Sequence, residues 1–244
     1  MKLANALAKT PAFWLLVIVS IHVIYPWVLL RKVPVIKVER LSNRAIRLYF
    51  SPKEIVPPLH GLSISDAPLH EWHSFAAISD TAGTDGGAAS CIVSKAGDWT
   101  AKTVNHPAGF YYMRGCHMTG TLYMAKVFKR VVIMATGSGV GPCLALFGHA
   151  PRTKIRFLWF ASSPRSTFGE KIMHRVLEQD PQAVIWDTQI KGQARPDVVT
   201  MAHTLYTAME AEALFFISNK KLTKKVVREL KMLGVPAYAP VFDS

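Results

Sequence analysis

The sequence predicts an N-terminal transmembrane helix, then a small antiparallel β-barrel, then an α/β domain with a doubly wound parallel sheet. Three observations predict this order: an uncharged apolar stretch, a series of short strands divided by turn residues, and strands that alternate with helices in the C-terminal half. We therefore expect a membrane anchor at residues 1–32, a barrel domain at 33–128 and an α/β domain at 129–244.

The apolar stretch at residues 11–30 has the length of about one bilayer crossing, which takes roughly 20 residues. Trp14, Tyr25 and Trp27 lie toward its ends, where aromatic rings favour the membrane interface. A signal peptide is the alternative interpretation, but the apolar run is long and no small-x-small cleavage site follows it. Because His22 is the only histidine in this stretch, we expect no haem in the chain.

Basic residues directly after this stretch indicate its orientation. Between residues 31 and 47 there is one acid, Glu39, and the basic residues are Arg31, Lys32, Lys37, Arg40, Arg44 and Arg47. The positive-inside rule then places the C-terminal domains in the cytosol. We expect a single-pass membrane protein that contacts lipid through residues 11–30.

The first strands of the barrel are predicted from alternating apolar patterns. Residues 35–41 and 44–50 alternate in this way, and Ser42 and Asn43 between them are typical of a hairpin turn. Prolines and a glycine between residues 57 and 68 predict a loop. Further strands are expected at residues 72–79, 90–95 and 110–114, with a glycine-rich turn at 81–89.

Three short clusters in the barrel region combine aromatic, hydroxyl and glycine residues. They lie at residues 71–76, 97–100 and 114–120, and the second is typical of a turn that opens a helix. Taken alone, Trp72 and Phe75 are expected in the core. The clusters therefore indicate a ligand site only in combination with other evidence.

The strongest single motif follows the first strand of the α/β domain. An apolar run at residues 131–135 leads into a glycine-rich turn at 136–142 and then a helix start at 143–147. Glycines let the backbone approach a pyrophosphate, and a helix N-terminus presents free N–H groups to it. A tight turn without a ligand is the alternative. The candidate phosphate-binding residues are Gly137, Ser138, Gly139, Gly141 and Pro142.

The rest of the domain repeats the strand–helix pattern. Strands are expected at residues 155–160, 183–186, 213–218 and 237–239, and helices at 167–179, 196–212 and 221–233. The second strand is followed by Ser162 and Arg165, whose hydroxyl and guanidinium suit the 2′-phosphate of NADPH. Arg165 as a solvated loop residue is the alternative.

The charge and the remaining polar residues exclude some function classes. Half of the residues are hydrophobic and the net charge is +13, but no nucleic-acid motif occurs, so we expect no nucleic-acid partner. The basic residues of the last helix are expected on a solvated face or near anionic lipid. The three cysteines form no C-x-x-C pair, and His70 and His73 lack the H-E-x-x-H pattern, so we expect no metal site.

A barrel followed by a nucleotide-binding α/β domain resembles the ferredoxin-NADP reductase superfamily, over roughly residues 33–244. The apolar N-terminal segment and the sequence His73-Ser74-Phe75-Ala76 are closer to its ferric reductase and NADPH oxidase branch. Within that branch, the chain is most similar to the fungal group of TmpA-like integral membrane flavoproteins. The sequences Ile217-Ser218-Asn219 and Gly234-Val235-Pro236 add to this likeness.

The resemblance implies FAD in the barrel domain. It implies that His73 neighbours the FAD phosphates or ribityl chain and that Phe75 lies against the isoalloxazine ring, with Ser74 between them as a further cofactor-binding residue. Ala76 stands where the family often has Ser or Thr. Trp99 and Thr100 resemble the stretch that meets the FAD diphosphate, and Phe242 is the candidate for the C-terminal aromatic that covers the flavin.

The resemblance also implies NADPH in the α/β domain, with NADH as the less favoured donor. The family's nucleotide loop maps onto the glycines named above, and its late Cys-Gly-Pro motif corresponds to Ser218-Asn219, so the cysteine is absent. The implied function is a membrane-anchored FAD-dependent oxidoreductase that passes a hydride from NADPH to FAD and electrons to an unknown acceptor. No side chain is assigned a catalytic acid–base role. The alternatives are a weak or inactive flavoprotein with a signalling role, and a flavin-free NADP-dependent enzyme or sensor.

Overall fold

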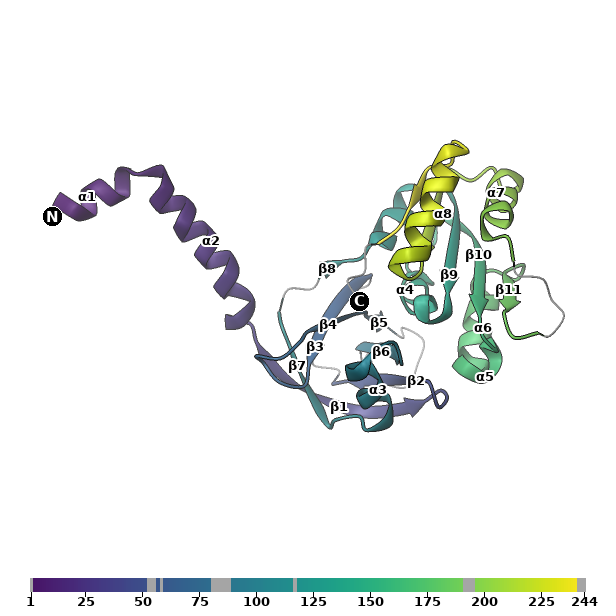
Figure 1. The fold of residues 1–244 in the computed structure, drawn as a ribbon, viewed down its shortest axis with the longest axis horizontal. Helices are drawn as coiled ribbons and strands as arrows, with labels where there is room; N and C mark the ends of the chain where they lie inside the picture. Colours follow the sequence, from purple (N-terminus) through teal and green to yellow (C-terminus); the bar gives the residue numbers. More distant parts are fainter. Residues whose placement is uncertain are drawn as a thin grey trace.

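The computed structural model describes residues 2–51, 56–57, 59–79, 89–115, 118–190 and 196–240. An N-terminal helical segment, an antiparallel sheet and a parallel sheet with helices follow one another along the chain (Figure 1). The predicted fold class is therefore confirmed. The helical segment consists of α1 (Lys2–Lys9) and α2 (Pro11–Val28).

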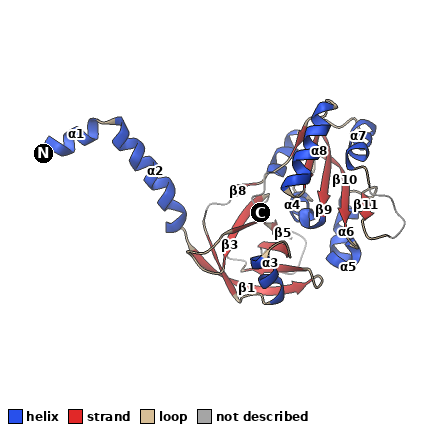
Figure 2. Ribbon diagram, viewed as in Figure 1, coloured by secondary structure: helices blue, strands red, loops and turns tan. Residues whose placement is uncertain are grey.

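Helix α2 extends away from the rest of the chain (Figure 2). It begins where the sequence predicts and ends at Val28, two residues before the predicted end. None of its side chains is buried, and its mean hydropathy is 1.8, so by length and composition it is able to cross a membrane. The first strand begins at Arg31, only three residues later and earlier than predicted.

The antiparallel sheet is curved and nearly closed. Its strand order is β4-β3-β7-β1-β2-β6-β5, β8 pairs with β3, and β4 at one edge also contacts β6 near the other. Helix α3 (Asp98–Asn105) covers one end of it. The strands are β1 (Arg31–Arg40), β2 (Ala45–Phe50), β3 (His60–Ser65), β4 (His73–Ala76), β5 (Ile78–Ser79), β6 (Ala89–Ser94), β7 (Phe110–Met113) and β8 (Met118–Thr119).

Two predictions for the barrel are wrong in detail. The stretch predicted as a loop contains β3, in which Leu62 and Ile64 alternate into the core. Gly61 lies within this strand, and glycine suits the position because a Cβ there would lie only 3.3 Å from the carbonyl oxygen of Phe75 on β4. The single strand predicted at residues 72–79 is divided at Ala77, since β4 pairs with β3 whereas β5 pairs with β6. The glycine-rich turn predicted at 81–89 lies, except for its last residue, outside the described residues.

The parallel sheet has the order β11-β10-β9-β12-β13, so the strand order reverses between β9 and β12. All of its neighbouring strands are parallel, as predicted. Its strands are β9 (Arg130–Thr136), β10 (Lys154–Ala161), β11 (Val184–Asp187), β12 (Ala213–Ile217) and β13 (Ala237–Tyr238). Its helices are η1 (Thr121–Val127), η2 (Gly137–Gly139), α4 (Val140–Leu146), α5 (Pro164–Phe168), α6 (Glu170–Gln179), α7 (Val198–Ala208) and α8 (Lys220–Met232).

The predicted helix at residues 167–179 starts earlier and is interrupted. Gly169 has φ +83°, a backbone conformation that favours glycine, and it separates α5 from α6. The predicted helix at 196–212 is shorter than expected: it begins at Val198, where Asp197 caps it, and ends at Ala208. The Asp197 carboxylate accepts hydrogen bonds from the N–H groups of Val199 and Thr200, both at 3.2 Å.

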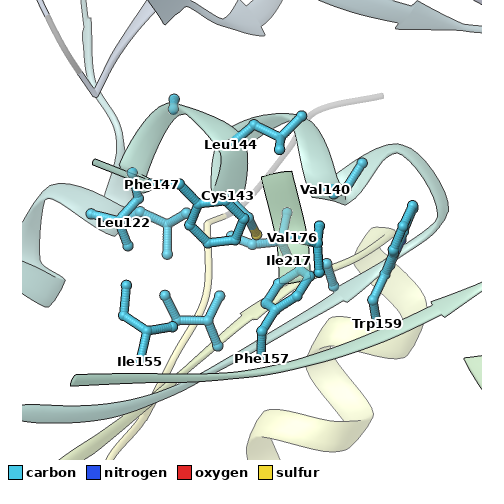
Figure 3. Packing of buried hydrophobic residues seen from close by; sticks show 14 of the residues in the cluster. Leu122, Val140, Cys143, Leu144, Phe147, Ile155, Phe157, Trp159, Val176 and Ile217 are labelled. Atoms are coloured by element: carbon cyan, nitrogen blue, oxygen red, sulfur yellow. The ribbon is translucent and has the colours of Figure 1, made fainter. Parts of the chain in front are cut away.

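Three hydrophobic clusters hold the chain together. The largest lies between α4 and the parallel sheet, where Cys143 and Phe147 face Phe157 (Figure 3). Ile78 and Ile92 of the barrel belong to the same cluster, so the two sheets share a core. Leu122 and Ala125 of η1 also pack there, although the domain boundary after residue 128 stays a prediction.

Candidate functional site

Three of the residues predicted to contact flavin come together on one side of the barrel. His73 and Phe75 alternate on β4, and both rings lie against Trp99 in the first turn of α3. The His73 ring is stacked on Trp99 with centroids 4.0 Å apart, and the Phe75 ring follows at 6.2 Å. Tyr111 of β7 contacts the same indole ring at 6.0 Å. Ser74, between the two aromatic positions, is exposed.

This aromatic group contains two buried nitrogen atoms without a hydrogen-bond partner in the described structure, His73 Nε2 and Trp99 Nε1. His73 Nε2 lies 3.5 Å from the exposed carboxylate of Glu71 without a hydrogen bond to it. An indole N–H is always a donor, and an imidazole nitrogen donates when it carries the proton. Because buried polar groups in proteins nearly always have partners, these two atoms are candidates to bond a polar ligand.

The turn before α3 adds backbone donors beside these side chains. Thr100 Oγ1 accepts hydrogen bonds from the N–H groups of Ala96 and Gly97, at 2.8 and 2.9 Å, and thereby holds the turn. No side chain caps the helix, and the first N–H groups of any helix lack a partner within it. Thr100 therefore shapes the turn with its hydroxyl, while the free N–H groups of the first turn are available to an anion.

The glycine loop at the end of β9 is tightly held. Gly137 has φ +51°, and its carbonyl oxygen accepts a hydrogen bond of 2.9 Å from Trp159 Nε1. A Cβ at Gly139 would lie 2.7 Å from the carbonyl oxygen of Ile217, so only glycine lets α4 begin this close to β12. Ser138 is exposed at the tip of the loop. Pro142 lies in the first turn of α4, as predicted.

Two hydroxyl groups meet where the strand order reverses. Thr136 Oγ1 at the end of β9 and Ser218 Oγ at the end of β12 are 2.6 Å apart and hydrogen-bonded. Ser218 is buried, and its carbonyl oxygen accepts a hydrogen bond of 3.0 Å from Thr223 Oγ1 of α8. In doubly wound sheets, ligands bind in the crevice beyond the carboxyl ends of the strands at this reversal. The structure therefore places Ser218 and the glycine loop at the expected position for a nucleotide.

The nucleotide loop and the flavin strand are packed together. Helix α4, which follows the glycine loop, lies against β4 and β5 of the barrel. A Cβ at Gly141 would be in ordinary contact, 3.9 Å, with Cβ of Ile92 on β6. The two candidate sites therefore adjoin across one packed boundary between the sheets.

One of the two predicted 2′-phosphate residues lines an open depression of about 490 Å³ at the ends of β10 and β11. Arg165 lines it, but its Nη1 atom forms an ion pair of 2.6 Å with Glu170. Ser162 does not line the depression, and its carbonyl oxygen accepts a hydrogen bond from Thr167. Ser163 and Ser166 line it instead, together with Asp187, whose carboxylate accepts a hydrogen bond of 2.8 Å from the Ser163 N–H.

The remaining sequence predictions concern Phe242, the cysteines and a metal site. Phe242 and Cys116 lie outside the described residues. Cys91 and Cys143 are buried and unpaired, and burial raises the pKa of the Cys91 thiol to about 12. Within the described residues, no group of three His, Cys, Asp or Glu side chains is arranged to hold a metal ion.

Several residues of the site were not predicted from the sequence. Thr136 directly precedes the first glycine, which is the signal that could have identified it. Ser163 and Ser166 stand beside the predicted Ser162 and Arg165 and line the depression, and Ser163 has a left-handed backbone with φ +45°. Trp159 and Tyr111 carry no local signal, because strand pairing brings them to the site.

Two curated relatives of Coprinopsis cinerea, adenylate-forming reductase 03009 and adenylate-forming reductase 06235, are 44% and 42% identical to this chain over 244 residues. The aligned region covers 99% of this chain and 23% of each relative, so the chain spans about a quarter of their length. Residues 121–244 match the model of a family described as adenylate-forming reductase 03009, C-terminal domain.

Solved structures share the fold at low sequence identity. A ferredoxin NADP+ reductase from Neisseria gonorrhoeae with bound FAD and NADP superposes with a TM-score of 0.66 and 12% identity. The match covers 87% of this chain and 98% of that one. The predicted likeness to ferredoxin reductases is therefore confirmed at the level of fold. The ferric reductase branch and the TmpA-like group stay predictions.

Proposed function

The chain belongs to the family of the adenylate-forming reductase 03009 C-terminal domain, and on this premise we propose that it is an FAD-dependent NAD(P)H oxidoreductase unit. In this proposal it passes a hydride from NADPH to FAD and electrons on to an acceptor that is not yet identified. The names of its relatives and the fold that it shares with ferredoxin reductases support this proposal. The bound FAD and NADP belong to that solved structure and are proposed for this chain.

The barrel residues fit the phosphates of FAD. The buried His73 Nε2 and Trp99 Nε1 atoms lack partners in the described structure, and the N–H groups that open α3 lie in the same turn as Trp99. Such donors match the oxygens of a diphosphate. Phe75 offers an aromatic face for a planar ring. When bound, FAD supplies the redox chemistry, and the protein supplies its orientation and electrostatics.

The α/β residues fit a dinucleotide. Gly139 lets α4 begin close against β12 at the strand reversal, and the hydrogen-bonded pair of Thr136 and Ser218 forms a fixed polar edge there. Arg165, Ser163 and Ser166 line the depression in which we propose the 2′-phosphate of NADPH binds. NADH is the less favoured donor.

The observation that carries the proposal is the packing of α4 against β4 and β5. It joins the helix that follows the glycine loop to the strand that carries His73 and Phe75. A hydride transfer requires its donor and acceptor to be held close together with water excluded. A shared hydrophobic core across this boundary supplies that rigidity and dryness.

We also propose that α2 anchors the chain in a membrane and that the two sheets lie on the cytosolic side. The length and apolar surface of α2 support the anchor, and the basic residues after it support the orientation. No nucleic-acid partner is proposed. The resemblance to the TmpA-like branch, which rests on the apolar segment and the sequence His73-Ser74-Phe75-Ala76, belongs to the same proposal.

Anaerobic titration of the detergent-purified chain with NADPH, and in parallel with NADH, tests the function. We expect a yellow protein whose visible flavin absorbance is bleached by NADPH at lower concentration than by NADH. A colourless protein that does not bind added FAD would refute the flavin assignment. Nucleotide binding by such a protein would favour the flavin-free alternative.

A second candidate function is a weak or inactive flavoprotein with a signalling role. It is favoured by Ala76, which has no hydroxyl group, and by Ser218, whose hydroxyl is already bonded to Thr136. Bound flavin that NADPH does not bleach under anaerobic conditions would support this alternative and contradict the reductase.

A further inference from the structure

The end of α2 is held against the barrel by a compact group of side chains. Trp27, in the last turn of the helix, meets Trp72 edge to face with centroids 6.4 Å apart. The Arg114 guanidinium lies over both rings, 4.2 Å from the Trp72 centroid and 5.7 Å from that of Trp27. We call these three side chains the junction.

The chain after α2 and the chain after β7 also approach each other closely beside the junction. A Cβ at Gly115 would lie 2.3 Å from Cβ of Leu29, so a residue other than glycine would push the helix end away from the barrel. Together with the junction side chains, this contact restrains the direction in which α2 leaves the barrel. The connection is therefore packed and does not resemble a loose tether.

A turn between β3 and β4 lies beside the junction. Trp72 Nε1 donates a hydrogen bond of 3.2 Å to the carbonyl oxygen of Pro68, and the His70 N–H donates one of 3.1 Å to that of Ala67. Leu69 stands at the tip of this turn and is 88% exposed, more than any other exposed large hydrophobic side chain in the described part of the chain. A single exposed leucine means little by itself, but this one lies on the turn that contacts the end of the apolar helix.

We propose that the turn carrying Leu69 rests in the surface of the bilayer that α2 crosses, as a second membrane contact. This inference rests on the proposed membrane anchor. Tryptophan and arginine side chains are suited to the headgroup region, where the ring body is shielded and the polar end stays wet. Arg31 and Lys32 directly follow the helix and are exposed, which suits anionic headgroups.

The consequence is a fixed orientation of the barrel on the membrane. A single helix would let the barrel rotate about the helix axis. A helix and an adjoining turn that both contact the bilayer would fix which side of the barrel faces the membrane. The membrane-facing part of the barrel is then the end that carries the turn between β3 and β4 and the junction, whereas β4 itself packs against α4. Helix α6 lies at the opposite end of the molecule from α2 and stays in water (Figure 1).

An environment-sensitive fluorophore on single cysteines tests the proposal in the full chain, reconstituted in phosphatidylcholine vesicles with phosphatidylserine. The labelled variants are Leu69→Cys, Val19→Cys in α2 and Leu177→Cys in α6, in a background with Cys116→Ser. Cys91 and Cys143 are buried and do not compete for the label. Nitroxide lipids with the quencher at the headgroup or in the acyl chain report depth.

We expect headgroup nitroxides to quench the label at position 69, acyl-chain nitroxides to quench that at 19, and neither to quench that at 177. A lipid signal at 19 with none at 69 overturns the second contact and leaves the anchor intact. Water-like emission at both positions refutes the anchor itself, and the second contact with it. A signal at 69 that depends on the protein-to-lipid ratio indicates a second copy of the chain on this surface and also overturns the proposal.

A second variant tests the junction. Trp72→Ala in the Leu69-labelled protein removes the ring that joins the turn to Trp27 and Arg114. We expect it to weaken headgroup quenching at 69 severalfold, while the same substitution in the Val19-labelled protein leaves acyl-chain quenching unchanged. Unchanged quenching at both positions would show that the junction does not hold the turn at the membrane.

Discussion

The two candidate cofactor sites differ in how completely the chain satisfies their own polar groups. At the nucleotide loop, Trp159 donates to the Gly137 carbonyl oxygen, and the hydroxyls of Thr136 and Ser218 bond each other. In the barrel, the nitrogens His73 Nε2 and Trp99 Nε1 are buried without a hydrogen-bond partner among the described residues. The side chains of the first site bond one another and the glycine loop, whereas the second site leaves two buried nitrogens without a partner among the described residues.

This difference indicates where ligand binding will matter for stability. A buried donor without a partner costs about 1–3 kcal/mol, and a ligand oxygen that accepts from it removes that cost. Substitutions at the nucleotide loop should therefore weaken the folded chain itself. Substitutions at the two barrel nitrogens should leave the ligand-free chain intact and weaken FAD binding.

The largest expected effect is at Gly139. The Gly139→Ala substitution places a Cβ 2.7 Å from the Ile217 carbonyl oxygen. Neither atom can move by a side-chain rotation, so the backbone of α4 or β12 must shift. We expect a loss of about 1–3 kcal/mol in the free energy of unfolding, typical of an overpacked core. Urea unfolding followed by circular dichroism measures it.

The matched control is Gly97→Ala at the turn before α3. A Cβ there meets no atom within 4 Å, and the backbone is extended, so the free energy of unfolding should change by no more than about 0.5 kcal/mol. Equal losses in the two variants would contradict the contrast between the sites.

The next effect is at the hydroxyl pair. Thr136→Val keeps the side-chain shape and leaves the buried Ser218 hydroxyl without its partner, which should lower the free energy of unfolding by about 1–3 kcal/mol. Adding Ser218→Ala removes the orphaned hydroxyl and should recover part of the loss. A double-mutant cycle from urea unfolding gives the coupling, and additive losses would show that the pair does not interact.

A smaller effect is expected at the 2′-phosphate residues. Arg165→Ala should lower the ratio of kcat/KM for NADPH to that for NADH by roughly fivefold, because a charge-assisted contact at an exposed position is worth about 1 kcal/mol. Glu170→Gln frees Arg165 from its ion pair and should raise the same ratio. A shift of the NADPH-to-NADH ratio in the same direction in both variants would indicate that Arg165 does not contact the nucleotide.

The smallest effect concerns an ion pair between the barrel and the α/β part. Glu39 Oε1 lies 3.2 Å from Lys171 Nζ. Partial burial alone would raise the pKa of Glu39, but the hydrogen bond from Tyr49 and the pairing with Lys171 outweigh it and hold the pKa below its ordinary value of 4.5. Because the folded pKa is the lower one, the stabilisation is fully present above pH 4.5 and is lost as the pH falls through the folded pKa.

We expect Glu39→Gln to lower the free energy of unfolding by less than about 1 kcal/mol at neutral pH, as for other solvent-screened pairs. Thermal unfolding across the acidic range checks it, with Glu178→Gln on the exposed face of α6 as the control. The loss of stability in Glu39→Gln should shrink at acidic pH. An equal loss at neutral and at acidic pH would contradict the assignment of this effect to the ion pair.

The α/β half of the fold could be predicted from the sequence because its signals are local. A continuous apolar run followed by glycines predicts β9 and the start of α4 within a few neighbouring residues. The barrel depends on pairing between distant strands, and β3 was missed because its short alternation contains Gly61 and lies between prolines. Gly169 interrupts a helical pattern by its positive φ, which sequence periodicity alone does not indicate.

For the candidate site, the sequence predicted which residues take part but not how they interact. His73, Phe75 and Trp99 were identified through family resemblance, and the structure shows that the first two rings both stack on Trp99. Arg165 was predicted as a phosphate ligand, yet its pairing with Glu170 depends on the break between α5 and α6. Trp159 reaches Gly137 only because β10 pairs with β9.

The contrast between the sites is tested most directly by His73→Phe. This substitution keeps an aromatic ring to stack on Trp99 and removes both ring nitrogens. We measure the free energy of unfolding without FAD and the affinity for FAD by flavin fluorescence. The account predicts an unchanged or higher stability and about a 10- to 100-fold weaker FAD affinity, as for a lost hydrogen bond to a charged group. Lower stability with unchanged FAD affinity would contradict it.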